Sequence, residues 1–105
     1  MPKVIWDHQA RNDLYRIAFY IGREKGSVQG AHNLIDSIVK KCREYAKHPE
    51  LGEARPELGE NIRIFPCGTK SNPRNWVVIY RPMDEGIQIV RLFHGAQDYP
   101  SLLGG

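Results

Sequence analysis

The sequence has few of the features that mark metal, redox or membrane proteins. It contains only two cysteines, Cys42 and Cys67, and they do not form a C-x-x-C pair. Because zinc sites need three or four clustered ligands, and no phosphate-binding glycine loop or serine-nucleophile motif occurs, we expect no metal and no other cofactor. No apolar run approaches membrane-spanning length, and the first seven residues hold no secretory apolar segment. We therefore expect a cytoplasmic protein without a membrane partner.

The length and composition are those of one small globular domain. Hydrophobic residues make up 41% of the chain and charged residues 26%, which argues against disorder. A chain of 105 residues can form a two-layer core but not a large enclosed substrate pocket, so we expect a single domain over residues 1–105. Fifteen lysines and arginines against twelve acids give a net charge of +3. This modest excess fits an acidic protein or a nucleic acid as partner.

Two amphipathic helices are expected in the first half of the chain. Asp7 is placed to cap the first helix, Lys25 and Gly26 to end it, and Ser27 to cap the second. The short link between the helices predicts an antiparallel hairpin. The apolar stripe of the first helix comprises Ala10, Leu14, Ile17, Ala18 and Ile21, and that of the second Val28, Ala31, Leu34, Ile35, Ile38, Cys42, Tyr45 and Ala46.

Strands are expected before and after the helices. A short apolar run at residues 4–6 predicts a first strand, and after a polar connector at residues 50–60 the apolar period changes from helical to alternating. Three further strands are predicted at residues 62–65, 76–81 and 87–94, joined by turns. The fold class is therefore α+β, of order β-α-α-β-β-β. The N-terminal strand and an antiparallel two-helix hairpin are expected on one face of a small, mainly antiparallel sheet.

Strand alternation predicts one apolar face and one face that carries arginines. The helix-facing set would be Ile62, Ile64, Trp76, Val78, Tyr80, Val90 and Leu92, and the opposite set Arg63, Phe65, Val77, Ile79, Arg81, Ile89, Arg91 and Phe93. Arg63, Arg81 and Arg91 would then form a binding face for anionic groups, because guanidinium groups match phosphate and carboxylate oxygens. The alternative is that these arginines pair with local acids or face water.

The last predicted strand and the C-terminal tail also contain residue types suited to RNA cleavage. Such a reaction without a metal needs a base, a cation for the phosphorane charge and an acid. Arg91, His94 and Tyr99 could fill these roles. Against this, His94 and Arg91 have opposite strand parity and are expected on different faces, and His94 could instead make structural hydrogen bonds.

Several phrases of the sequence, in their order and spacing, resemble the RelE/ParE superfamily of toxins from type II toxin–antitoxin systems, and the ParE branch more closely. The resemblance covers almost the whole chain. The segment His94–Asp98, H-G-A-Q-D, is similar to the ParE ending H-G-A-R-D, with Gln97 in place of the arginine. The other matching segments are residues 10–14, Ile17, Tyr20, Ile21, and residues 38–49, 52–58, 76–81 and 87–93.

The resemblance implies a toxin that inhibits DNA gyrase by protein–protein contact, traps it on cleaved DNA and is neutralised by a cognate antitoxin. RelE-like relatives are instead ribosome-dependent mRNA endoribonucleases, which is the alternative function for this chain. A non-toxic binding module is a further alternative. Arg63, Arg81, Arg91 and the tail residues Asp98, Leu102 and Leu103 are the expected binding residues, and Arg91, His94 and Tyr99 the catalytic ones if the chain is a ribonuclease.

Overall fold

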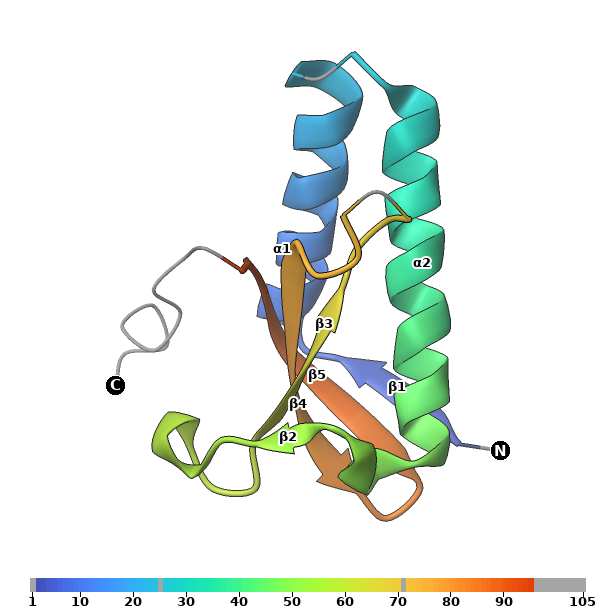
Figure 1. Cartoon of the computed structure of the whole chain (residues 1–105). Coiled ribbons are helices and arrows are strands. Elements are labelled where there is room, and N and C mark those ends of the chain that lie inside the picture. The colour runs from blue at the N-terminus through green and yellow to red at the C-terminus, as the bar shows by residue number, and fades with distance from the viewer. Residues whose placement is uncertain (1, 25, 71, 96–105) are drawn as a thin grey trace.

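The chain folds into a helical hairpin packed on one face of a five-stranded sheet (Figure 1). The computed structural model describes residues 2–24, 26–70 and 72–95. The elements are β1 (Lys3–Trp6), α1 (His8–Phe19), the π-helical turn η1 (Tyr20–Glu24), α2 (Val28–Lys47), the 3₁₀ turn η2 (Pro49–Leu51), β2 (Glu53–Ala54), the 3₁₀ turn η3 (Pro56–Leu58), β3 (Arg63–Cys67), β4 (Trp76–Met83) and β5 (Gly86–His94). The predicted fold class is confirmed.

The sheet has the strand order β1-β5-β4-β3-β2. β1 pairs in parallel with β5, and all other neighbours are antiparallel. β2 is a two-residue strand inside the segment expected to be a polar connector, and its residues pair with Arg63 and Ile64 of β3. Farther along the same edge, α2 covers β3, since Lys41 Nζ donates to the Pro66 carbonyl at 3.2 Å and the Ser37 hydroxyl donates to the Gly68 carbonyl at 2.5 Å.

The boundaries of the two helices follow the predicted capping residues. The Ser27 hydroxyl accepts a hydrogen bond from the Gly30 N–H at 2.9 Å, and Gly26 has the left-handed φ of +65° that ends the preceding turn. Asp7 lies at the N-cap of α1, but its side chain makes no capping hydrogen bond. Its Oδ1 instead accepts from Gln88 Nε2 at 2.6 Å, which ties the start of α1 to β5.

The core lies between the hairpin and the sheet. Ala10, Leu14 and Ile17 of α1 are buried as the periodicity predicts. On α2 the buried positions are Ala31, Leu34, Ile38, Cys42 and Ala46, whereas Val28 is 66% exposed and lies outside the core. Tyr45 stacks on Phe65 with ring centroids 3.9 Å apart. The Tyr80 ring packs edge to face with Tyr45 and at a tilt against Phe65. Among the residues that the structure describes, no helix is long and apolar enough to span a bilayer.

The strand register shows that the predicted division of the sheet faces is partly wrong. Directly opposed residues project to the same face, and Phe65 pairs with Val78 while Ile64 pairs with Ile79. The helix-facing core therefore contains Phe65 and not Ile64. Ile89 also faces the helices, opposite Tyr80, because the β4–β5 register shifts between Ile79 and Tyr80. Such a bulge moves side chains to the other face.

The opposite face of the sheet, which we call the open face, holds a second apolar cluster. Ile62, Ile64, Ile79 and Phe93 are buried there, and Leu58, Val77 and Val90 pack against them half-buried. This face was expected to display arginines among apolar groups, and the apolar part of that expectation is correct for Val77, Ile79 and Phe93.

Candidate functional site

The three arginines predicted to share one face do not gather. Arg63 pairs with Tyr80 and so lies on the side of the sheet that faces the helices, whereas Arg91 pairs with Ile79 on the open face. Arg81 pairs with Gln88, one position after the helix-facing Tyr80, and also falls on the open face. The prediction of one common arginine face is therefore wrong for Arg63. The error arose from the register between β3 and β4, which strand parity alone does not determine.

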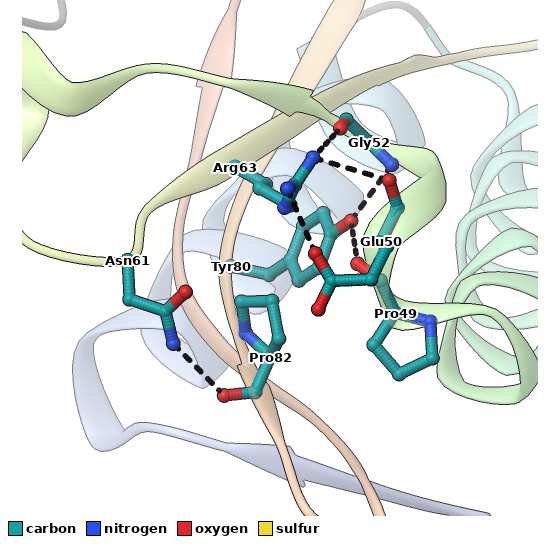
Figure 2. A network of polar contacts seen from close by, with 7 residues as sticks. All are labelled: Pro49, Glu50, Gly52, Asn61, Arg63, Tyr80 and Pro82. Carbon is teal, nitrogen blue, oxygen red and sulfur yellow. Dashed lines mark hydrogen bonds and ion pairs between the residues drawn. The ribbon is translucent and has the colours of Figure 1, made fainter.

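Arg63 holds the connector between α2 and β3 (Figure 2). Its Nη1 donates to the carbonyl oxygens of Glu50 at 3.1 Å and Gly52 at 2.6 Å, and its Nη2 lies 2.7 Å from Glu50 Oε2. The Tyr80 hydroxyl donates to the Pro49 carbonyl at 2.6 Å and accepts from the Gly52 N–H at 2.9 Å. Burial raises the pKa of Tyr80, and the Gly52 hydrogen bond partly offsets this. All these bonds hold η2 and the start of β2 against the sheet, so Arg63 has a structural role.

Arg91 is held by a buried carboxylate. Asp13 of α1 is 5% exposed, and its side chain accepts from Arg91 Nε at 2.8 Å and from Arg91 Nη2 at 3.2 Å. The same carboxylate accepts the backbone N–H of Leu92 at 3.0 Å. The Arg91 guanidinium also lies 4.5 Å from the centre of the Phe93 ring. Asp13 therefore joins α1 to β5 and neutralises the arginine.

This arrangement exists because β5 extends beyond its parallel partner. The pairing with β1 ends at Trp6 and Ile89, so on this edge the rest of β5 lies beside α1, while its other edge stays paired with β4. Asp13 satisfies a backbone donor on that stretch of the strand, as a buried N–H requires. Asp13 was not singled out from the sequence, although an acid between Ala10, Leu14 and Ile17 on the buried stripe of a helix is a usable indication of a buried pair.

A hollow of about 520 Å³ opens at this junction of α1 and β5. We call it the β5-edge cavity. Its polar lining comes from Asp13, Arg16, Tyr20, Arg91 and His94, and its apolar lining from Ile17, Trp76, Leu92 and Phe93. His94 meets the Trp76 ring edge to face, with centroids 5.0 Å apart.

Arg91 and His94 thus line one cavity, although their strand parity predicted separate faces. The alternation itself holds, since Arg91 pairs with Ile79 and His94 with Trp76. Both side chains nevertheless reach the same hollow because it lies at the strand edge, where the two faces meet. Arg16, Tyr20 and Trp76 complete the lining and were not expected there. Asp98, Tyr99, Leu102 and Leu103 lie outside the described residues.

The described part of the chain contains no group of three or more His, Cys, Asp or Glu side chains placed to hold a metal ion. Its two cysteines are free and buried in the helix-facing core. Burial raises the pKa of each thiol to about 12, with the neighbouring Cys67 adding to the effect at Cys42. Both thiols are therefore protonated and unreactive at neutral pH.

Comparison with known proteins agrees with the resemblance seen in the sequence. The family model described as "ParE toxin of type II toxin-antitoxin system, parDE" matches residues 4–99. The fold is similar to that of a solved structure of the chromosomal ParDE toxin–antitoxin system from P. aeruginosa, with a TM-score of 0.68 and 20% sequence identity over 90% of this chain and 96% of that one. A search of curated proteins found no match. The chain belongs to the ParE family of toxins from type II toxin–antitoxin systems.

Proposed function

We propose that this toxin binds DNA gyrase and traps it on cleaved DNA, and that a cognate antitoxin neutralises it by covering part of its surface. Gyrase is the target that the resemblance to ParE-like toxins implies. Membership of a toxin–antitoxin family and the fold shared with a ParDE structure support a protein antitoxin as partner. Both contacts would take place in the cytoplasm.

The observation that carries the proposal is the pairing of Arg91 with Asp13. A ribonuclease would need Arg91 as a cation that stabilises the developing charge on phosphate. Here the guanidinium uses Nε and Nη2 on a buried carboxylate, and it is 18% exposed. Taking Arg91 from Asp13 would leave the carboxylate buried without its partner, which is strongly unfavourable. The pair therefore supports action by contact over action by catalysis.

The open face offers a surface that fits the antitoxin. Val77 and Val90 are half-buried apolar residues there, and Arg81 and Arg91 lie on the same face. An acidic, amphipathic segment that orders on contact would cover the apolar residues and meet the positive charge of Arg81, whereas the charge of Arg91 is already met by Asp13. We propose that the antitoxin contributes such a segment. Arg81 and Arg91 stay in the proposed binding set, whereas Arg63 supports the connector from the other side of the sheet.

The proposal is tested by a gyrase supercoiling and DNA-cleavage assay with the purified toxin. Wild-type toxin should block supercoiling and increase the amount of cleaved DNA, and the protein encoded by the neighbouring reading frame should reverse both effects. Normal supercoiling at a large excess of folded toxin would rule out gyrase as the target. If expression of the folded toxin also leaves growth unaffected, the non-toxic binding module becomes the better description.

One observation favours the endoribonuclease as a second candidate. Arg16, Arg91 and His94 line a single cavity, which brings cationic and acid–base side chains together. Under this hypothesis His94→Ala should reduce ribosome-dependent mRNA cleavage by roughly 10²–10⁴-fold. Tyr99→Phe tests the third candidate residue in the same assay. Absence of cleavage by the wild-type protein on translating ribosomes would remove this candidate.

A further inference from the structure

The outer surface of α1 displays large aromatic side chains to solvent. Tyr15 is 63% exposed, Phe19 61% and Tyr20 49%. Tyr15 and Phe19 are four residues apart and so are neighbours on one side of the helix. None of the three belongs to either buried apolar cluster of the domain. Large aromatic side chains that are left this exposed next to one another point to contact with another molecule.

Arginines surround these aromatic residues. Arg11, Arg16 and Arg23 are exposed, and the Arg23 guanidinium lies 5.5 Å from the centre of the Phe19 ring. Asp13 is the only acid in α1, and it is buried against Arg91. The exposed side of α1 therefore carries positive charge and aromatic groups without an acid of its own. This charge is complementary to an acidic surface.

The position of this surface favours insertion into a larger partner. The α1–α2 hairpin extends past the end of the sheet, so the C-terminal part of α1 and η1 project from the body of the domain (Figure 1). α1 also passes into a π-helical turn at Tyr20–Glu24, a rare conformation that occurs frequently at functional sites. Tyrosine and arginine are among the residues that most often dominate binding energy at protein interfaces.

We propose that Arg11, Tyr15, Phe19, Tyr20 and Arg23, which we call the α1 tip surface, dock into an acidic, partly apolar cleft of the protein that the toxin inhibits. The inference rests on the proposed function in one respect, namely that the toxin acts by contact with a target protein. The inference adds the surface that makes this contact. That surface is distinct from the open face, which lies on the other side of the sheet. A second copy of the chain is a poor occupant, because facing tip surfaces would bring their arginines together.

The test uses a double variant, Tyr15→Gln with Phe19→Gln, in which both new residues are good helix formers. Met83→Gln is the matched control, because Met83 is a 42% exposed apolar residue at the end of β4. The β4–β5 turn that follows it lies at the other end of the molecule from the hairpin tip (Figure 1). The full-length proteins are compared in three measurements: growth arrest on induction, affinity for the antitoxin from the neighbouring reading frame, and affinity for purified gyrase holoenzyme.

The double variant should stay folded, bind the antitoxin as the wild type does and fail to arrest growth, while Met83→Gln stays toxic. Its affinity for gyrase should fall by about 30-fold or more, the loss expected for a binding hot spot. Undiminished growth arrest by the folded double variant would overturn the inference. So would a parallel loss of antitoxin binding, which would assign the tip surface to the antitoxin.

The growth measurement separates this inference from the choice of gyrase. If the wild-type toxin arrests growth but does not bind gyrase, gyrase is wrong as the target, and the double variant still tests the tip surface through growth. Two further outcomes overturn the inference. The first is that the free toxin binds a labelled DNA duplex and that Arg11→Gln and Arg23→Gln abolish this binding. The second is that the wild-type toxin forms a dimer and the double variant is a monomer.

Discussion

Removal of the Asp13 carboxylate tests the link between α1 and β5 that organises the β5-edge cavity. Asp13→Ala removes two hydrogen bonds to Arg91 and one to the Leu92 N–H. A buried donor left without a partner costs about 1–3 kcal/mol, and breaking a buried ion pair costs about 3–5 kcal/mol. Arg91 is 18% exposed, so water compensates part of its charge. We therefore expect a loss near the lower end of the second range, about 3 kcal/mol.

The measurement is urea unfolding followed by circular dichroism. Asp13→Asn should cost less than Asp13→Ala, because the amide oxygen still accepts the Leu92 N–H while the charge is lost. Asp36→Ala, at an exposed position of α2, is the control and should change stability by less than about 0.5 kcal/mol. Once Arg91→Gln is present, Asp13→Ala should cost less than it does in the wild type, because the two side chains interact directly. A loss below about 1 kcal/mol for Asp13→Ala in the wild type would show that these three hydrogen bonds do not hold α1 to β5.

Three other changes test separate parts of the fold. Tyr80→Phe removes the hydroxyl that bonds Pro49 and Gly52 and should cost about 1–3 kcal/mol, with hydrogen exchange at the Gly52 amide rising as the local sign; an unchanged exchange rate would count against the network of Figure 2. Gly86 has a φ of +151°, and an added Cβ would meet the Lys3 backbone, whereas Gly26 has a φ of +65° and open space around it. Gly86→Ala should therefore lower the melting temperature more than Gly26→Ala does. Equal thermal shifts in the two variants would contradict this. Burial raises the pKa of both thiols from 9.0 to about 12, so the unfolded chain loses these protons at lower pH than the folded chain. The contribution of the thiols to stability should therefore be fully present below pH about 9 and be lost as the pH rises toward about 12. Cys42→Ala should flatten that fall, and a urea midpoint with the same pH dependence in this variant and the wild type would disprove the thiol origin.

The helical hairpin was predictable because its evidence is local. The apolar spacing of α1 and α2, Gly26 at the turn and the Ser27 cap each depend on neighbours within a few residues, and each is found in the structure. The sheet was predictable only as a set of strands. Its register comes from contacts between distant segments, and one shift between Ile79 and Tyr80 moves Ile89 to the helix-facing side.

The candidate site was less predictable for the same reason. Arg63 looked like a surface arginine, and the pairing with Tyr80 that turns it toward the connector depends on the β3–β4 register. Strand parity separated Arg91 from His94 correctly, but parity carries no information about where the neighbouring strand ends. The early end of β1 opens the strand edge, and Asp13 then reaches β5 from a helix 78 residues away in the sequence.

The proposed action by protein contact with gyrase and the alternative of RNA cleavage would leave different products in the cell. The most direct measurement follows induction of the toxin in growing cells, mapping DNA ends covalently linked to gyrase and new mRNA 5′ ends in the same samples. If the toxin acts on gyrase, gyrase-linked DNA ends should accumulate before growth stops, while mRNAs on ribosomes stay intact. New mRNA ends at fixed codon positions without gyrase-linked DNA breaks would contradict this proposal.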